Sequence, residues 1–96
     1  AADVYVTSMG VEAYALTVAE QLRDSCPELR IMMHCGGGNF KKQLKRADKT
    51  GATVAVLLGS DEAEKQLATV KPLRGDGEQE TVALSALAEK LAGLVN

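Results

Sequence analysis

Residues 34–51 read HCGGGNFKKQLKRADKTG, and the rest of the chain is organised around this stretch. Its glycine triplet at 36–38 can bend a backbone where a Cβ would clash. Phe40, Leu44 and Ala47 then fall at helical spacing, and basic residues fill most of the positions between them. The stretch therefore predicts a glycine-rich loop followed by a helix with one apolar side and one strongly cationic side.

The cationic side of this helix has two interpretations. Its basic residues are Lys41, Lys42, Lys45, Arg46 and Lys49, with Asp48 as the one acid against them. Surface helices often carry such charge runs as a solvated face. The same cations, together with the free backbone N–H groups at the helix N-terminus, also suit a polyanion such as a phosphate backbone. The residues alone leave both interpretations open.

Length and composition limit the class of protein. The chain has 96 residues, which suffices for one domain with a single core. A hydrophobic content of 46% and a charged content of 25% are typical of a globular protein and not of a disordered one. The net charge of -2 excludes a generally basic nucleic-acid coat, so any RNA contact must be local. The three aromatic residues, Tyr5, Tyr14 and Phe40, provide poorly for a sheet rich in stacking rings.

The apolar runs and the cysteines of the chain indicate its location and its capacity to bind a metal. No apolar run approaches the ~20 residues of a membrane span, and no signal peptide is apparent. Cys26 and Cys35 are ordinary for the reducing cytosol, so a cytoplasmic protein is expected. These thiols and His34 could be soft metal ligands, but they lack the C-x-x-C spacing of a zinc site. The chain enters a strand almost at once without an initiator Met, which favours a piece of something longer.

Apolar periodicity predicts alternating strands and helices over the first 58 residues. Strands are expected at 3–8, 29–34 and 53–58, and a helix over 11–26 precedes the glycine loop and the basic helix. Pro27 ends the first helix, and Gly51 ends the second because glycine readily adopts the left-handed conformation. The apolar run at 31–33 suggests a second strand that is buried on both faces.

These elements also predict the topology. Two right-handed crossovers make the first three strands parallel, with helices on both faces of the sheet. A strand order of 2-1-3 then places a ligand-binding crevice beyond the carboxyl ends of strands one and three. The residues expected around this crevice are Thr7, Ser8, Met9, Gly59, Ser60, Asp61 and Glu62.

The last third of the chain follows a different pattern. Residues 60–66 form a polar connection too short for another crossover, so residues 67–73 should return antiparallel beside strand three. Pro72 is tolerated near the end of that strand. A turn at 75–77 and a short edge strand over 78–80 are expected next. A terminal helix follows, with Thr81 as its N-cap. Its buried side comprises Val82, Leu84, Leu87, Ala88, Leu91, Leu94 and Val95. The expected fold class is α/β, a three-layer mixed sheet of four or five strands with a βαβαβ frame and three main helices.

The motifs of an autonomous enzyme are missing. The glycine triplet is neither GxGxxG nor the Walker pattern GxxxxGK[ST]. The single histidine, His34, shows no pattern that ties it to a serine nucleophile. Asp61, Glu62 and Glu64 could form an acid–base pair, although such clusters in polar turns are usually solvated. We therefore expect no catalytic residue, metal site or cofactor within these 96 residues.

A resemblance to a known family rests on four features of the chain. They are GGGNFKKQLKRADKTGA at 36–52, the hydrophobic strand after it, the G-x-x-E element at 59–62 and the V-K pair at 70–71. Over essentially its whole length the chain resembles the C-terminal anticodon-binding domain of histidyl-tRNA synthetases. The related class II enzymes for threonine, proline and glycine share the frame and the G-x-x-E element. Their second helix reads differently, which favours the histidine enzymes.

The resemblance implies a fold and a function. Residues 1–96 would form the anticodon-binding domain of a longer, homodimeric, cytoplasmic ligase that charges tRNA(His) with histidine. Its ATP and magnesium would belong to a separate catalytic domain of the same chain, and none of the class II catalytic motifs is present here. The domain itself would hold the anticodon stem-loop of tRNA(His).

The resemblance also implies site residues. In the related threonine enzyme, the Glu of the G-x-x-E element and a basic residue on the following strand contact anticodon bases, which correspond to Glu62 and Lys71. A carboxylate can accept from guanine, and a lysine can donate to a carbonyl oxygen of guanine or uracil. The other residues expected to contact the tRNA are Ser8, Met9, Asn39, Lys41, Lys42, Lys45 and Arg46.

Two further functions stay open at this point. One is a stand-alone or regulatory synthetase-like domain that binds RNA or a protein partner without charging activity. The other is a small flavodoxin-like protein that holds a phosphorylated ligand with residues 36–39. Glu62 and Lys71 could also be ordinary surface residues without a role in base recognition.

Overall fold

The chain folds into five strands and four helices in the computed structural model, which describes residues 2–34, 37–75 and 77–95. The predicted positions Cys35, Gly36 and Asp76 lie outside the described residues. The elements in chain order are β1 (Val4–Ser8), α1 (Glu12–Ser25), β2 (Ile31–Met33), α2 (Phe40–Lys49), β3 (Val54–Leu58), α3 (Ser60–Lys65), β4 (Leu67–Pro72), β5 (Glu80–Ala83) and α4 (Leu84–Val95).

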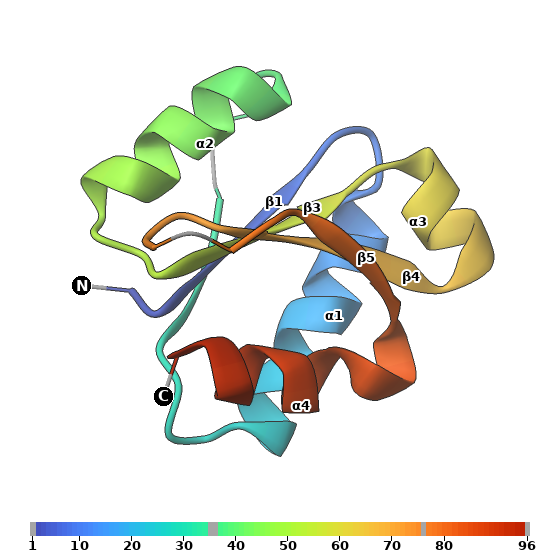
Figure 1. Ribbon diagram of the computed structural model, residues 1–96. Helices are drawn as coiled ribbons and strands as arrows, with labels where there is room; N and C mark the ends of the chain where they lie inside the picture. Colours follow the sequence, from blue (N-terminus) through green and yellow to red (C-terminus); the bar gives the residue numbers. More distant parts are fainter. Residues whose placement is uncertain (1, 35–36, 76, 96) are drawn as a thin grey trace.

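The strands form one mixed sheet in the order β2-β1-β3-β4-β5. β1 runs parallel to both β2 and β3, whereas β4 is antiparallel to β3 and β5 is antiparallel to β4. Helices α1 and α4 lie against one face of the sheet and α2 against the other, with α3 beyond one end (Figure 1). This arrangement confirms the predicted α/β class, the three layers, the 2-1-3 order of the first strands and the antiparallel return.

Two hydrophobic clusters occupy the two faces of the sheet. The larger one joins α1 and α4 to the sheet through fully buried side chains such as Val18, Val56 and Leu87. The smaller one lies on the α2 side and consists of Ala2, Tyr5, Ala47 and Ala52, with Leu73 packed against it. Burial of one Val or Leu side chain contributes roughly 1.5–3 kcal/mol. The larger cluster, which is rich in these residues, therefore supplies most of the stability.

The alternation of side chains along the strands assigns each residue to a face. Val56 and Val70 are paired in the sheet and both belong to the larger cluster. Their neighbours Thr69 and Lys71 consequently point to the opposite face, which is the α2 side. Tyr5 lies on that side too, since it belongs to the smaller cluster.

β2 differs from the prediction, because it is an edge strand and is not buried on both faces. Met32 is 42% exposed, and its flanking residues Ile31 and Met33 are only partly buried. The apolar run was typical of a central strand, but the direction of the first crossover places β2 outside β1. An edge strand has a neighbour on one side only, so its apolar side chains are less covered.

The C-terminal third differs from the prediction in three places. The polar connection contains the short helix α3, which ends at Gln66 in the left-handed conformation with φ 58°. The edge strand is β5, Glu80–Ala83, and not residues 78–80. Thr81 is not the helix N-cap, because it lies within β5 and pairs with Thr69. The predicted buried residue Val82 still packs on the larger cluster, although it does so from the strand. Pairing with β4 thus outweighs local capping preference.

Candidate nucleic-acid interface

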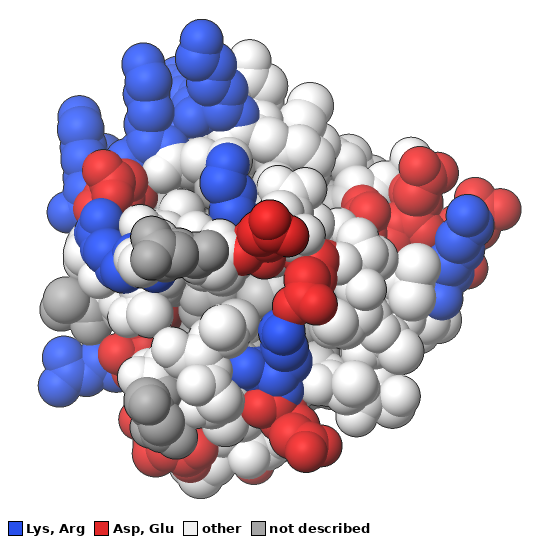
Figure 2. Space-filling model, viewed as in Figure 1, with Lys and Arg blue, Asp and Glu red and all other residues white. Residues whose placement is uncertain are grey.

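Helix α2 presents an exposed basic surface, which we define as Lys41, Lys42, Lys45 and Arg46. Basic side chains gather over α2, whereas acidic ones gather over α3 at the other end (Figure 2). Asp48, the acid of this helix, is ion-paired with Arg74, whose Nη1 lies 2.5 Å from Oδ1. Within residues 2–34, 37–75 and 77–95, no ion pair involves the basic surface itself. Its charge therefore remains available to a polyanion.

The start of α2 is fixed by the glycine loop and by Asn39. The backbone φ values of Gly37 and Gly38 are +67° and +95°, which explains the glycines at these two predicted positions. Asn39 is the N-cap, and its Oδ1 accepts a 2.9 Å hydrogen bond from the backbone N–H of Lys42. The far end of α2 is followed by Gly51 with φ +79°, which agrees with the predicted stop.

Gln43 is a buried polar residue that sequence reasoning missed. Its side chain is fully buried, and its Nε2 donates to the carbonyl oxygens of Ser8 at 2.8 Å and Gly38 at 2.7 Å. Its Oε1 accepts from the backbone N–H of Ser8 at 3.0 Å. One side chain thereby fixes α2 and the glycine loop to the carboxyl end of β1. The signal was present, since position 43 falls on the same helical stripe as Phe40, Leu44 and Ala47.

His34 provides a second attachment of the glycine loop. Its Nε2 lies 2.8 Å from the carbonyl oxygen of Gly37, and its Nδ1 lies 2.7 Å from the hydroxyl of Tyr5. Because a carbonyl can only accept, Nε2 carries a proton, and in the neutral imidazole Nδ1 then accepts from the hydroxyl of Tyr5. His34 thus has a structural role here. Among the described residues, no three His, Cys, Asp or Glu side chains are grouped as a metal site would require.

Cys26 is a buried thiol and not a reactive one. Burial, and secondarily the negative charge of Glu28, raises the pKa of Cys26 above its ordinary value. Its Sγ lies 3.7 Å from the carbonyl oxygen of Ala88, so it packs α1 against α4. A thiol with a raised pKa is a poor nucleophile and a poor metal ligand.

The carboxyl ends of β1 and β3 place several predicted residues together. Ser8 is held by Gln43, and Met9, which is 43% exposed, donates its backbone N–H to the carbonyl oxygen of Leu58 at 3.1 Å. Thr7 does not belong to this group, which corrects the prediction. It is fully buried, and its Oγ1 donates to the carbonyl oxygen of Val56 at 2.8 Å. Ser60 and Asp61 lie exposed on α3.

Glu62 lies in the first turn of α3, just beyond the carboxyl end of β3, where the sequence placed it. Its Oε1 accepts from the backbone N–H of Gly59 at 2.7 Å and so closes the first turn of α3. Its Oε2 accepts a longer hydrogen bond, 3.4 Å, from the hydroxyl of Thr69. Thr69 in turn lies 3.0 Å from the hydroxyl of Thr81 across the β4–β5 pair. Burial raises the pKa of Tyr14, and the negative charge of Glu62 raises it further.

Lys71 lies on the same face as Glu62 and Thr69 but is displaced along β4. The register pairs Thr69 with Leu57 and Lys71 with Ala55, so Thr69 and not Lys71 contacts Glu62. Same-face neighbours in a strand are about 7 Å apart. We call Glu62, Thr69 and Lys71 the polar row. Thr69 was missed because sequence alone did not give the register between β3 and β4.

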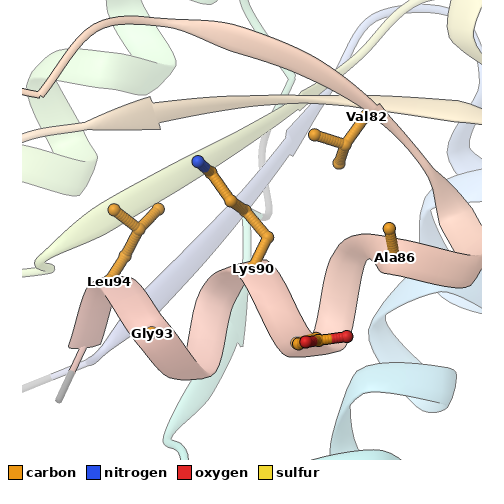
Figure 3. A pocket seen from close by; sticks show the side chains of 6 residues that line it. Val82, Ala86, Lys90, Gly93 and Leu94 are labelled. Carbon is orange, nitrogen blue, oxygen red and sulfur yellow. The ribbon is translucent and has the colours of Figure 1, made fainter.

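A groove on the opposite face of the sheet differs from this site. It has a volume of about 520 Å³ and lies between β5 and α4 (Figure 3). It is lined by Val82, Ala86, Glu89, Lys90, Gly93 and Leu94. Lys90 is ion-paired with Glu80, so this groove presents no unpaired cation among its lining residues.

Among the described residues, no helix combines the length and apolar character that crossing a bilayer demands.

Comparisons with known proteins agree with this geometry. The protein family described as "Anticodon binding domain" matches residues 3–94. The histidyl-tRNA synthetase of Nostoc sp. PCC 7120 is 36% identical with a TM-score of 0.87, and the match covers 99% of this chain and 23% of that chain. The apo histidyl-tRNA synthetase of S. aureus is 29% identical with a TM-score of 0.79, over 94% of this chain and 26% of that one.

A third similar structure extends the fold comparison. The RNA binding domain of threonyl-tRNA synthetase from Cryptosporidium parvum Iowa II has a TM-score of 0.85 at 17% identity, and the match covers 97% of this chain and 23% of that chain. At that identity the likeness shows the fold alone. The chain spans about a quarter of the length of the synthetases it matches.

Proposed function

The chain belongs to the anticodon-binding domain family of class II aminoacyl-tRNA synthetases, and on that premise we propose that it recognises the anticodon stem-loop of tRNA(His). The likeness to two histidyl-tRNA synthetases supports histidine over the related amino acids. The observation that carries the proposal is that the basic surface of α2 and the polar row lie on one side of the sheet. That side combines a cationic helix for phosphates with polar side chains for bases.

The domain would act as one module of a longer histidine-tRNA ligase. Residues 1–96 would be its anticodon-binding domain, and a separate catalytic domain of the same chain would charge tRNA(His) with histidine, using ATP and magnesium. We propose a cytoplasmic homodimer for the complete enzyme. The match to about a quarter of each histidyl-tRNA synthetase supports the division into modules.

The basic surface would supply affinity without choosing the sequence. Lysine and arginine contacts to phosphates release counterions, which favours binding to any RNA backbone. Such contacts fix the register and orientation of the nucleic acid but carry no direct sequence information. Gln43 would support this role, because it holds α2 against the end of β1.

The polar row would read the bases. The histidine codons CAU and CAC pair with a GUG anticodon, so guanine and uracil must be recognised. The Glu62 carboxylate can accept from the N1–H and N2–H groups of guanine, and the Lys71 ammonium can donate to a carbonyl oxygen of guanine or uracil. Thr69 would keep Glu62 in place through the hydrogen bond that its hydroxyl donates to Oε2.

The direct test uses the protein at its full native length and RNA stem-loops that differ only in the anticodon. The protein should bind the tRNA(His) stem-loop more tightly than the same stem carrying a threonine anticodon, as measured by fluorescence anisotropy. It should also attach radiolabelled histidine to tRNA(His) in the presence of ATP and magnesium. Equal affinity for both loops, or charging with a different amino acid, would refute the proposal.

Glu62→Gln should weaken binding selectively to guanine-containing loops. Glutamine keeps an oxygen that can accept from the Gly59 N–H, so the start of α3 is retained, but it places an amide in front of the donors of guanine. We expect the binding free energy for the GUG loop to weaken by about 1–3 kcal/mol. A loop with adenine in place of each guanine should show a much smaller loss, because the contact is already missing.

A double-mutant cycle makes this measurement specific. It combines Glu62→Gln with each guanine replacement and reports their coupling energy. Lys71→Met serves as the parallel variant for the other end of the polar row. Coupling energies near zero at every base would remove both residues from base recognition and leave only the basic surface.

A further inference from the structure

Arg74 adds a cation to the C-terminal end of α2, although it belongs to another part of the chain. It lies two residues beyond the end of β4, and its Nη1 lies 2.5 Å from Oδ1 of Asp48. Its Nη2 donates a 3.0 Å hydrogen bond to the backbone carbonyl oxygen of the same residue. The guanidinium is therefore held by two contacts beside the last turn of α2.

The backbone that carries Arg74 is held in place as well. The N–H group of Leu73 donates to the carbonyl oxygen of Thr53 at 2.9 Å, and the Leu73 side chain packs against the smaller cluster. Gly75 follows with φ +82°, a conformation that favours glycine. The chain therefore bends directly after Arg74, and the guanidinium has a fixed starting point beside α2.

Asp48 interrupts a row of cations on α2. Lys41, Lys45 and Asp48 follow one another at spacings of four and three residues, so they are neighbours on the helix surface. The row covers about 10 Å along the helix axis. Arg74 places a positive charge next to its acidic end. The row thus ends in a guanidinium and not in an uncompensated carboxylate.

The contacts with Asp48 leave most of the hydrogen-bonding capacity of Arg74 unused. A guanidinium has five N–H donors, and these contacts use two of them. Among the residues that the structure describes, Arg74 has no other partner, and 47% of its side chain is exposed. The planar fork of a guanidinium matches the oxygens of a phosphate. The remaining donors can therefore bind an RNA backbone that lies along α2.

We propose that Arg74 is a further contact for the tRNA backbone and that Asp48 is the residue that positions it. Both roles rest on the proposed function, because they need an RNA that lies along α2. A carboxylate among phosphate-binding cations repels RNA, and its contacts with Arg74 supply a reason for its presence. Phosphate contacts orient a nucleic acid without reading its sequence. Arg74 therefore contributes equally to the binding of every anticodon loop.

The same contacts have a purely structural interpretation. Arginine side chains near a helix C-terminus can bond its last carbonyl groups and interact favourably with its dipole. An exposed ion pair, however, contributes little to stability. A helix cap would change the melting temperature but not the salt dependence of RNA binding. The experiment therefore measures both quantities.

The first variant is Arg74→Gln in the protein at its full native length. Anisotropy measures its binding to the tRNA(His) anticodon stem-loop and to the same stem carrying a threonine anticodon. We expect about a 10-fold loss of affinity with both loops at 0.1 M salt, and a slope of log K against log salt that is flatter by about one unit. Arg23→Gln is the matched control, since Arg23 is an exposed arginine on α1 that also donates to a backbone carbonyl oxygen. It should keep the parent affinity and slope.

Asp48→Asn and Asp48→Ala test the positioning role. Both remove one negative charge, but only asparagine keeps an oxygen that can accept from Nη1 of Arg74. A long side chain that is already held in place loses less entropy on binding, so Asp48→Asn should bind about three-fold more tightly than Asp48→Ala. This difference should vanish when Arg74→Gln is added to each variant. Melting temperatures establish that all variants are folded.

The outcomes separate the Arg74 contact from the proposed function. If Arg74→Gln lowers the melting temperature but keeps the parent slope, Arg74 is only a helix cap and the contact is refuted. If Arg74→Gln and Arg23→Gln flatten the slope equally, only net charge matters and the contact is refuted too. Equal affinities of Asp48→Asn and Asp48→Ala refute the positioning role. If the parent protein binds both loops equally while Arg74→Gln still flattens the slope, the backbone contact stands and the proposed recognition of tRNA(His) fails.

Discussion

Replacing Gln43 with leucine is expected to lower the free energy of unfolding by about 3 kcal/mol, the largest stability change that we expect from a conservative substitution on α2. Leucine has a similar volume but cannot hydrogen-bond. The N–H and carbonyl groups of Ser8 and the carbonyl group of Gly38 would lose their shared partner. These three hydrogen bonds are partly buried, and a typical hydrogen bond contributes about 1 kcal/mol net, so the loss of all three accounts for about 3 kcal/mol. Urea unfolding followed by circular dichroism measures the change.

Gln21→Leu provides the control for this experiment. Gln21 is an exposed glutamine on α1, and the same substitution there should alter stability by less than about 0.5 kcal/mol. A similarly small change for Gln43→Leu would mean that water replaces the three hydrogen bonds. In that case the attachment of α2 to β1 would depend on the smaller cluster alone.

Reversing two charges of the basic surface, Lys42→Glu with Arg46→Glu, should lower the affinity for any tRNA about 100-fold at 0.1 M salt. The two residues are one turn apart on α2, so they face the same stretch of backbone. Counterion release at each phosphate contact contributes about a factor of ten at this salt concentration, and about one unit in the slope of log K against log salt. A salt titration by anisotropy should therefore give a slope that is flatter by about two units.

The control places the same change in charge elsewhere on the protein. Lys65→Glu with Arg23→Glu alters exposed residues on α3 and α1, away from the basic surface. This variant should keep the parent slope. If both double variants lose the same affinity, only net charge matters. An unchanged slope for the α2 variant would show that its cations are merely solvated.

The topology of the sheet could be predicted because it follows from the lengths of the connections and the handedness of the crossovers. Strand and helix periodicities are read locally, and the length of each connection decides whether the next strand returns parallel or antiparallel. Residues 60–66 were too short for a crossover, and β4 is indeed antiparallel to β3. Glu62, in the connection between these two strands, accordingly lies just beyond the carboxyl end of β3.

Details that depend on one neighbour could not be predicted in this way. Thr81 has the residue type of an N-cap, but pairing with β4 holds it in a strand. Met32 looked like a central residue, and only the order of the strands shows that it lies at an edge. Gln43 and Thr69 gain their roles from partners 35 and 7 residues away. Local propensity carries no information about such partners.

The two hydrophobic clusters hold the helices on the two faces of the sheet with unequal strength. α2 contributes only Ala47 to the smaller cluster and is otherwise held by the hydrogen bonds of Gln43, whereas α1 and α4 pack on the larger cluster with its many valines and leucines. Segments with few buried apolar contacts open at lower free energy than the whole molecule unfolds. Amide hydrogens of α2 would then exchange with solvent before those of the central strands. If the lysines of α2 bind RNA as proposed, the RNA would bind only the closed helix and would therefore slow this exchange.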